Sequence, residues 1–242
     1  MKTALITGAN KGIGFETAKQ LAQSGYYVYL GSRDKTKGLN AINKLKDLGI
    51  SNVETIEIDI TKINSIKQAK QELETKIESL DVLINNAAIT EEQPQKPSLI
   101  KVEELEKVFE TNFFGMVRTT QQFISLLKKS GEPRIINLSS ELGSLTMQSD
   151  TSWEMYDTAK SLTAYAATKS AINAFTVTLA YEFKDTNFKI NSVTPGFTAT
   201  GLNHFKGKKT VEEGARPIVK YATLANDVPT GKFFKDEGEV PW

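Results

Sequence analysis

The stretch TALITGANKGIG, residues 3–14, joins a short apolar run to the first helical pattern of the chain. Residues 3–7 predict a β-strand, and three glycines fall in the turn between this strand and the helix. A pyrophosphate must come close to backbone N–H groups and to the positive end of a helix, and Cβ atoms here would obstruct it. The stretch therefore predicts a phosphate-binding turn that opens a βαβ unit. The residues expected to bind a cofactor in this turn are Gly8, Asn10, Lys11, Gly12, Ile13 and Gly14.

Short runs of β-branched residues alternate with amphipathic segments along the whole chain. Alternation of this kind predicts a parallel sheet that is covered by helices on both faces. Strands are expected at residues 3–7, 26–31, 53–58, 81–85, 134–139 and 189–193. Helices are expected at residues 12–24, 34–48, 63–79, 101–129, 163–184 and 210–222. The least regular stretches, where a site is expected, are residues 88–100, 141–161 and 196–240.

The composition excludes several classes of function. Lys and Arg number 30 and Asp and Glu number 29, so no basic field would collect nucleic acid or an anionic membrane. The chain has no cysteine, so redox chemistry must come from a cofactor. No apolar run approaches the roughly 18 residues of a membrane-spanning helix, and the N-terminal run is too short for a secretory signal. We therefore expect residues 1–242 to form one cytoplasmic domain with a small-molecule partner and no nucleic-acid or membrane partner.

The end of the second expected strand favours NADP(H) over NAD(H). An enzyme that reads the ribose 2′-hydroxyl of NAD normally has Asp or Glu there, about 20 residues beyond the glycines. This chain has Ser32 and Arg33, and Asp34 comes one or two positions later, where it is expected to cap the next helix. Arg33 and Lys11 could hold a 2′-phosphate through charge-assisted hydrogen bonds. The alternative is that both are solvated surface cations, since Lys and Arg are mostly exposed.

Several short motifs together resemble the short-chain dehydrogenase/reductase family over essentially the whole chain. They are TGANKGIG (7–14), NNAA (85–88), TN (111–112), NLSSELG (137–143), YAATK (165–169) and TPGF (194–197). The glycine turn, the segment inserted before YAATK and the ending GKFFKDEGEVPW are most similar to the carbonyl reductase branch. The resemblance implies an α/β fold, a single-domain Rossmann-like three-layer sandwich with a seven-stranded parallel sheet in the order 3-2-1-4-5-6-7. Its seventh strand would lie near GKFF, residues 231–234, where the residue pattern alone predicts none.

The resemblance also implies which residues act in catalysis and in cofactor binding. Ser140 matches the family's catalytic serine because Gly143 follows it at the family's spacing, and Tyr165 and Lys169 match the tyrosine and lysine. Asn112 matches an asparagine that holds a water between this lysine and bulk solvent. The further cofactor contacts that the resemblance implies are Asp59, Ile60, Asn86, Ala87, Tyr165, Lys169, Pro195, Gly196 and Thr198.

Several of these matched residues have plainer interpretations. Ser140 could be a strand-end serine that caps a turn, and Pro195 and Gly196 could simply mark a turn. Helical spacing places Asn112 on an apolar stripe with Leu105, Phe109 and Met116, and a buried amide must find hydrogen-bond partners. Its side chain therefore either bonds to backbone within the core or holds the water that the resemblance implies. Asp59 either contacts the adenine or caps the helix that follows it.

Two tyrosines compete for the role of proton donor, because Tyr156 precedes Lys160 by four residues just as Tyr165 precedes Lys169. Residues four apart share a face of a helix, so each lysine would lie beside its phenol. Tyr165 has small neighbours and precedes a long apolar stripe, which predicts a rigid helix that a flat nicotinamide can approach. The neighbours of Tyr156 at positions 153–155 are bulkier. We therefore expect Tyr165 and Lys169 to do the chemistry, and Tyr156 either to line the substrate entrance or to pack on the outside.

The predicted activity is NADPH-dependent reduction of a ketone, aldehyde or quinone to an alcohol, with Tyr165 as the proton donor. A catalytically silent NADP(H)-binding sensor on the same fold is the alternative. We expect an inserted segment at about residues 141–161 and a substrate loop at about residues 198–222. The pocket wall is expected to come from residues 142–153, Phe197 and residues 198–214, whose apolar groups suit a small lipophilic carbonyl or alcohol. No metal is expected, because the single His204 has no second histidine or cysteine beside it. A monomer is favoured over a dimer, because carbonyl reductase-like members tend to be monomers.

Overall fold

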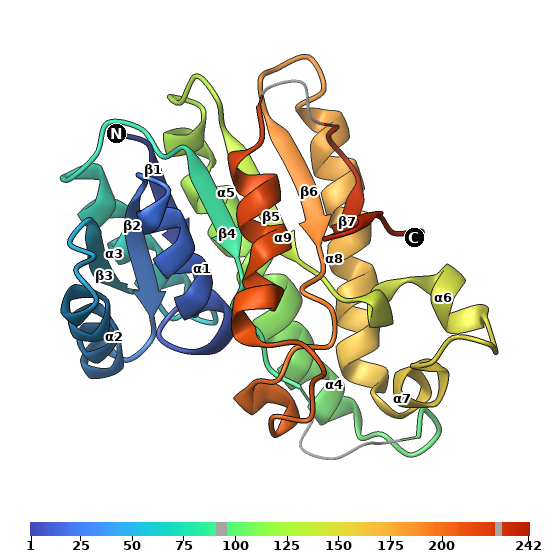
Figure 1. The fold of residues 1–242 in the computed structure, drawn as a ribbon. Coiled ribbons are helices and arrows are strands. Elements are labelled where there is room, and N and C mark those ends of the chain that lie inside the picture. Colours follow the sequence, from blue (N-terminus) through green and yellow to red (C-terminus); the bar gives the residue numbers. More distant parts are fainter. Residues whose placement is uncertain (91–95, 226–228) are drawn as a thin grey trace.

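One continuous sheet forms the centre of the protein in the computed structural model, which describes residues 1–90, 96–225 and 229–242 (Figure 1). The strand order is β3-β2-β1-β4-β5-β6-β7-β8, and neighbouring strands are parallel except for β7 and β8. This confirms the α/β three-layer fold and the order 3-2-1-4-5-6-7, and it adds one antiparallel strand that was not expected. The strands are β1 (Thr3–Ile6), β2 (Tyr27–Ser32), β3 (Val53–Glu57), β4 (Val82–Asn85), β5 (Arg134–Leu138), β6 (Lys189–Val193), β7 (Phe233–Lys235) and β8 (Gly238–Glu239).

Helices cover both faces of this sheet (Figure 1). The long ones are α1 (Gly12–Gln23), α2 (Lys35–Asp47), α3 (Ile63–Glu74), α4 (Val102–Phe109), α5 (Met116–Leu127), α8 (Thr163–Glu182) and α9 (Val211–Thr223). Shorter elements are the π-helix η1 (Glu110–Gly115), the 3₁₀ turns η2 (Glu141–Gly143) and η3 (Gly201–Asn203), and the helices α6 (Leu145–Ser149) and α7 (Tyr156–Ser161). The helix expected over residues 63–79 begins at Ile63 and ends earlier than expected, at Glu74.

Alternate residues of the strands enter two apolar cores, one on each face of the sheet. In β1, Ile6 lies in a core with α1, α2 and α9, whereas Leu5 lies in a core with α3, α5 and α8. In β4, Ile84 and Leu83 are divided between the same two cores. Burial on both sides explains why the strands are continuous apolar runs in the sequence. The carboxyl ends of these strands are thereby held at one edge, where the glycine turn and the predicted catalytic residues lie.

The helix expected over residues 101–129 is divided by the π-helix η1 between α4 and α5. Here the backbone closely approaches the segment after β3, because a Cβ atom on Gly115 would lie 2.9 Å from the Ile60 carbonyl oxygen. The expected apolar stripe is divided as well, since Asn112 is buried whereas Leu105 and Phe109 line a surface hollow. The prediction of one continuous stripe is therefore wrong. The extra residue of a π-turn rotates every later side chain relative to the first part of the helix.

The inserted segment and the end of the chain form short regular elements that pack on one another. Residues 141–161 contain η2, α6 and α7, and the last residues form the hairpin of β7 and β8. The Thr146 N–H donates to the Trp242 carbonyl oxygen over 2.9 Å, and Lys235 forms a 3.6 Å ion pair with Glu141. The inserted segment is therefore anchored to the edge of the sheet beyond β6.

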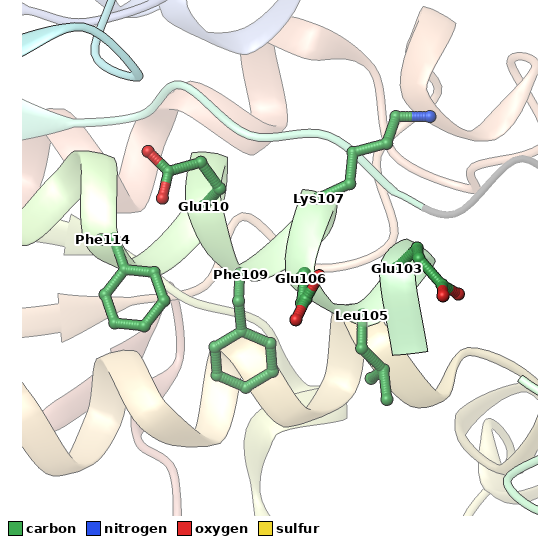
Figure 2. Close-up of a pocket in the computed structure, with 7 residues that line it drawn as sticks. All are labelled: Glu103, Leu105, Glu106, Lys107, Phe109, Glu110 and Phe114. Carbon is green, nitrogen blue, oxygen red and sulfur yellow. The ribbon is translucent and has the colours of Figure 1, made fainter. Parts of the chain in front are cut away.

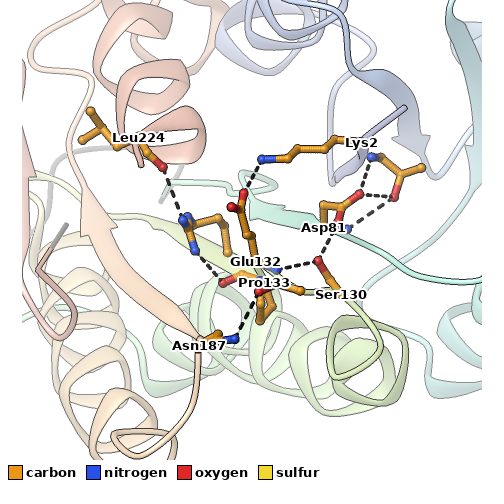
Figure 3. A network of polar contacts seen from close by, with 10 residues as sticks. Lys2, Asp81, Ser130, Glu132, Pro133, Asn187 and Leu224 are labelled. Atoms are coloured by element: carbon orange, nitrogen blue, oxygen red, sulfur yellow. Dashed lines mark hydrogen bonds and ion pairs between the residues drawn. The ribbon is translucent and has the colours of Figure 1, made fainter. Parts of the chain in front are cut away.

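A polar network closes the amino-terminal edge of the sheet, at the opposite end from the glycine turn (Figure 3). The Asp81 carboxylate accepts a hydrogen bond from the Thr3 N–H at 2.7 Å and one from the Ser130 hydroxyl at 2.6 Å. Arg134, which is 2% exposed, donates to the Leu224 carbonyl oxygen at 3.3 Å, just after α9. The network joins the beginnings of β1, β4 and β5 to the segments behind α5 and α9.

We expect Asp81→Ala to lower the free energy of unfolding by about 2 to 3 kcal/mol, because the Thr3 N–H and the Ser130 hydroxyl lose their acceptor. Binding of the cofactor expected at the glycine turn should not change, since the network lies at the opposite edge of the sheet. Urea unfolding measures the free energy of unfolding. Asp185→Ala removes an exposed carboxylate and should stay within about 0.5 kcal/mol of the wild type. Equal losses in the two variants would show that the network contributes nothing to stability.

Candidate active site

The glycine turn follows β1 and packs closely on the residues that follow β4. Gly8 and Gly12 have φ angles of +64° and +59°, in the region that favours glycine. A Cβ atom on Gly14 would lie 2.5 Å from the side-chain nitrogen of Asn86, so this position needs glycine for close approach. The Asn86 amide donates to the carbonyl oxygens of Thr7 and Gly8 at 2.8 and 3.1 Å. Asn86 therefore braces the turn, and its contact with an adenosine ribose stays a prediction.

The beginning of α1 presents N–H groups that suit an anion. Lys11 is the N-cap residue, its side chain makes no capping hydrogen bond, and the first turn of α1 contains no acidic residue. Among the described residues, a Cβ atom on Gly12 would meet only the Thr200 methyl group, at 3.9 Å, so the space beside the turn is open. Uncapped N–H groups next to open space favour a phosphate. The residues of the turn therefore fit the pyrophosphate of a dinucleotide.

The end of β2 presents Arg33 to solvent at the edge of a hollow of about 560 Å³. Asp34 accepts a hydrogen bond from the Lys37 N–H at 3.0 Å and caps α2, as the sequence predicts. Ser32 is buried, and its hydroxyl donates to the Asp34 carbonyl oxygen at 2.8 Å. The Asp34 carboxylate is thus engaged with its own helix, while Arg33 lines the hollow.

Asp59 and Ile60 follow β3 at the same edge, and Asp59 lines this hollow. The Asp59 carboxylate accepts hydrogen bonds from the Thr61 hydroxyl at 2.7 Å and the Thr61 N–H at 3.1 Å. Burial raises the pKa of Asp59, but these hydrogen bonds and the charge of Lys62 outweigh it and lower the pKa. Asp59 thus organises the turn before α3, but the N-cap residue of this helix is Lys62, so Asp59 does not have the capping role that the sequence left open. Ile60 is 6% exposed, and its side chain belongs to the core.

Pro195, Gly196 and Thr198 form the turn after β6. Gly196 has a φ of +70°, and the Thr198 hydroxyl donates to the Pro195 carbonyl oxygen at 3.1 Å. A Cβ atom on Gly214 of α9 would lie 2.4 Å from the same hydroxyl oxygen, so α9 packs directly on Thr198. The structure thus places these residues at the expected edge, with the threonine hydroxyl bonded within its own turn. Contact with the nicotinamide carboxamide stays a prediction.

The first part of the expected substrate loop connects the glycine turn with the inserted segment. The Ala199 N–H donates to the Lys209 carbonyl oxygen at 2.8 Å, which closes the base of the loop. The Thr200 methyl group lies beside Gly12 at one end. At the other end, Lys208 forms a 2.7 Å ion pair with Glu154 of the inserted segment. The two segments expected to surround a substrate are therefore in contact.

Tyr165 and Lys169 lie one turn apart on α8. The Lys169 Nζ lies 5.2 Å from the centroid of the Tyr165 ring and donates to the Leu138 carbonyl oxygen at 2.7 Å. Lys169 is 3% exposed, and this burial lowers its pKa from 10.5 to about 7. The arrangement places a readily titrated amine beside a phenol, as the sequence predicts for this pair.

Ser140 follows β5 and begins the turn η2. Its hydroxyl oxygen accepts a hydrogen bond from the Leu142 N–H at 3.2 Å. A Cβ atom on Gly143 would lie 2.6 Å from the Lys169 Cβ, so the turn packs directly on α8. Leu142 belongs to a small apolar cluster against which Tyr165 also packs. The structure therefore packs the turn that Ser140 begins against α8, which carries Tyr165 and Lys169.

Asn112 is 1% exposed and joins three segments from the π-helix η1. Its amide accepts from the Ile89 N–H and donates to the Ile89 carbonyl oxygen, both at 2.8 Å. The same amide nitrogen donates to the Thr168 hydroxyl at 3.1 Å. The side chain thus makes the backbone bonds that the sequence left open as an alternative. The role of holding a water stays a prediction.

The competing pair, Tyr156 and Lys160, belongs to α7 within the inserted segment. The Lys160 Nζ lies 5.0 Å from the centroid of the Tyr156 ring and donates to the Gln148 carbonyl oxygen at 2.8 Å. Lys160 is exposed, whereas Lys169 is buried. Burial therefore gives Lys169 the environment that lowers a lysine pKa.

A second hollow, of about 620 Å³, lies over α4 and η1 (Figure 2). Figure 2 shows Leu105, Phe109 and Phe114 pointing to one side of these helices, while Lys107 and Glu110 point to the other. None of the predicted site residues lines this hollow. The reactive side chains, and not the size of the hollow, therefore locate the candidate active site.

His204 is exposed on the substrate loop. Within residues 1–90, 96–225 and 229–242, no group of three or more His, Asp or Glu side chains is placed to hold a metal ion. Across the same described part of the chain, no helix is long and apolar enough to cross a membrane.

Known proteins match the chain along nearly its whole length. The family described as short chain dehydrogenase matches residues 2–210. The chain belongs to the short-chain dehydrogenase/reductase family. (+)-Neomenthol dehydrogenase of Capsicum annuum is 33% identical over 96% of this chain and 94% of the relative. Salutaridine reductase of Papaver bracteatum is 30% identical over 99% of this chain and 96% of the relative.

Solved structures of this short-chain dehydrogenase/reductase family have the same architecture. Salutaridine reductase from Papaver somniferum superimposes with a TM-score of 0.85 at 30% identity, over 98% of this chain and 100% of that chain. An NADPH-bound carbonyl reductase from chicken fatty liver has a TM-score of 0.85 at 24% identity, over 100% and 99% of the two chains, and supports the fold. The protein is therefore a carbonyl reductase-like oxidoreductase of a family that uses NAD(H) or NADP(H).

Three residues of this short-chain dehydrogenase/reductase contribute to the site without having been singled out from the sequence. The Thr7 hydroxyl accepts hydrogen bonds from the N–H groups of Asn86 and Ala87 at 3.0 and 3.1 Å. The Thr168 hydroxyl donates to the backbone carbonyl oxygen three residues earlier, at Tyr165, over 2.7 Å. Glu57 lines the hollow beside the end of β2. Thr168 lies within YAATK, so its position in a recognised motif is a signal that could have found it.

Proposed function

We propose that this oxidoreductase uses NADPH to reduce a lipophilic ketone or aldehyde to an alcohol, with Tyr165 as the proton donor. The observation that carries the proposal is the buried Lys169 amine, which lies 5.2 Å from the centroid of the Tyr165 ring, on a helix whose backbone packs against the turn that Ser140 begins. A binding protein does not require a buried amine beside a phenol. A reductase needs both groups, because the alkoxide it forms must receive a proton at once.

The three side chains have distinct roles in this proposal. The Ser140 hydroxyl donates a hydrogen bond to the carbonyl oxygen of the substrate and fixes its orientation. NADPH, when bound, supplies the hydride. The Tyr165 hydroxyl then gives its proton to the alkoxide oxygen, and the protonated Lys169 stabilises the tyrosinate that remains. A phenol ordinarily ionises near pH 10, so this stabilisation makes proton donation possible at neutral pH.

The substrate class proposed is a small lipophilic ketone or aldehyde, with the matching alcohol as the product. Tyr165 packs against a small apolar cluster that contains Leu142, and Trp153, Met155 and Leu162 pack against the same cluster, so these surroundings favour an apolar ligand. The relatives support this class, since they are named for neomenthol, salutaridine and isopiperitenone. The alignment with the Capsicum relative spans 299 positions against 242 residues here, so the pocket walls need not be the same.

Purified protein, NADPH and a panel of cyclic ketones, aldehydes and quinones test the proposal through the fall in NADPH absorbance. Turnover of at least one carbonyl compound is expected. The silent sensor is the competing function, and it predicts NADPH binding with no turnover of any compound in the panel. We further propose that residues 1–242 act as one NADP(H)-binding domain, as a cytoplasmic monomer, and light scattering of the purified protein measures the assembly state.

We expect kcat/KM with NADPH to exceed that with NADH by about 10- to 100-fold, because charge-assisted bonds to the 2′-phosphate are worth about 1.5 to 3 kcal/mol each. Arg33→Ala should remove most of this preference without changing kcat with NADPH at saturation. Arg216→Ala replaces another exposed arginine, on α9, and should leave the preference intact. Equal efficiency with the two cofactors in the wild type would contradict the assignment of Arg33 and Lys11.

A further inference from the structure

The turn that carries Ser140 is held by contacts from three separate segments. From α8, the Ser170 hydroxyl donates to the last carbonyl of η2 at 2.9 Å. From the C-terminal hairpin, Lys235 forms a 3.6 Å ion pair with the first residue of η2. From α6, the side-chain amide of Gln148 donates to the Leu142 carbonyl oxygen at 2.6 Å. The last of these contacts comes from the inserted segment and reaches the residue that bonds to Ser140.

Leu142 links Gln148 to the Ser140 hydroxyl. The Leu142 carbonyl oxygen accepts a hydrogen bond from the Gln148 side-chain amide, and the Leu142 N–H donates to the Ser140 hydroxyl oxygen at 3.2 Å. A serine hydroxyl has one hydrogen to donate and two lone pairs. Because the Leu142 N–H occupies one lone pair, the hydrogen is directed elsewhere and can be donated to the oxygen of a substrate. The orientation of Ser140 therefore depends on where Leu142 is held.

Lys160 holds Gln148 in its place. The Lys160 Nζ donates from α7 to the Gln148 backbone carbonyl oxygen at 2.8 Å, and the Gln148 N–H donates to the Ser144 carbonyl oxygen at 2.9 Å. The Tyr156 ring lies 5.0 Å from the same ammonium. The second tyrosine–lysine pair, which the chemistry leaves unused, thus braces α6 against α7.

We propose that Gln148 is a positioning residue for Ser140, with Lys160 as its brace. The inference rests on the proposed function, because the orientation of Ser140 matters only when its hydroxyl binds the carbonyl oxygen. Gln148 acts through Leu142. The hydrogen bond from Ser140 strengthens as negative charge develops on the substrate oxygen, so a small displacement of the hydroxyl slows the chemical step more than it weakens binding. The inserted segment therefore controls the rate of reduction in addition to contacting the substrate loop.

The test is a double-mutant cycle between Gln148 and Ser140. The quantity measured for each variant is the rate of NADPH oxidation in a single turnover. Gln148→Met keeps the length of the side chain and removes its hydrogen bond. We expect about tenfold slower hydride transfer, with NADPH affinity and the melting temperature close to the wild type. In the Ser140→Ala background, the same change should have no further effect, because the group that it positions is gone. Gln71→Met, on the exposed side of α3, is the matched control and should change nothing.

The outcomes separate the inference from the function on which it rests. Slow Ser140→Ala with normal Gln148→Met would overturn the positioning role and leave the reductase intact. A wild type that reduces no carbonyl compound would overturn both. Equal slowing by Gln148→Met in the two backgrounds would show that Gln148 acts independently of Ser140, which also overturns the inference.

Gln148→Glu supplies a readout that a purely structural role would not produce. A carboxylate cannot donate to the Leu142 carbonyl, but the protonated acid can. The Leu142 carbonyl oxygen raises the pKa of the introduced carboxyl, and the Lys160 ammonium lowers it. The rate of this variant, divided by that of the wild type, should therefore rise as the pH falls through that pKa. Gln148→Met should show a flat ratio over the same range, and a flat ratio for both variants would overturn the hydrogen-bond argument.

Discussion

Tyr165→Phe should reduce carbonyl reduction by about 10² to 10⁴, the usual contribution of a positioned general acid. The substitution removes one hydroxyl and keeps the ring that packs against the Leu142 cluster and lies 5.2 Å from the Lys169 Nζ. The fold and the NADPH affinity should therefore survive, and the loss should appear in kcat and in kcat/KM alike. Steady-state kinetics and fluorescence titration with NADPH measure the two quantities.

Tyr156→Phe is the matched control, because it removes the hydroxyl from the other tyrosine whose ring lies close to a lysine ammonium. Its ring would still contact the Lys160 ammonium, so the brace between α6 and α7 should persist. Most of the activity should remain, and any change should appear mainly in KM. An inactive Tyr156→Phe beside an active Tyr165→Phe would place the chemistry on α7 and overturn the assignment of the whole site.

The central strands were predictable because they bury both faces and are therefore continuous apolar runs, whereas their order in the sheet came from the resemblance to the family. The seventh strand, β7, came from family resemblance alone, because three residues between polar turns carry no periodic signal. β8 escaped prediction because it has two residues and begins at Gly238, whose φ of +140° is a turn conformation. Short elements of this kind depend on their neighbours. β8 forms because it pairs with Phe234 and Lys235 of the edge strand β7.

The interruption of the long helix was not predictable from spacing. The pattern through Leu105, Phe109, Asn112 and Met116 obeys a period of 3.6, yet the backbone inserts a π-turn across it. Two contacts far apart in sequence accompany this turn: the close approach of Gly115 to Ile60 and the two hydrogen bonds of Asn112 to the Ile89 backbone. Periodicity records which residues are apolar, and it holds no information on such distant contacts.

The candidate site was predictable where a residue's chemistry resides in its side chain. Tyr165 and Lys169 lie where the i, i+4 rule places them, and burial of the lysine follows from the packed helix. The partners of Asn86 and Asn112 were not predictable, because they are backbone groups of the glycine turn and of the segment after β4. An amide can bond to any backbone that tertiary packing brings close, so its sequence position does not identify its partner.

Lys169→Met should lower carbonyl reduction by about 10² to 10³ at pH 7, because the tyrosinate formed in the reaction loses its nearby positive charge. NADPH binding should weaken as well, as the resemblance to the family places this lysine at the cofactor. Lys184→Met is the matched control, because it removes a lysine that lies 4.3 Å from the centroid of a tyrosine ring farther along the chain, at Tyr181, which is 69% exposed. Its activity should equal that of the wild type, and an equal loss in both variants would contradict a role specific to Lys169.

The same substitution should make the cofactor-free protein more stable at low pH. Burial lowers the pKa of Lys169 to about 7 from 10.5, so between these values the unfolded chain binds a proton that the folded protein has released. Wild-type stability therefore rises with pH across this window, and below about pH 7 the folded state carries the full cost of a buried ammonium.

Methionine removes that cost and keeps the length of the side chain. The gain in the free energy of unfolding for Lys169→Met should thus be on the order of a few kcal/mol at pH 6 and should shrink steadily toward pH 10. Urea unfolding of both proteins at several pH values measures it, and a difference independent of pH would mean that Lys169 keeps its ordinary pKa in the folded protein.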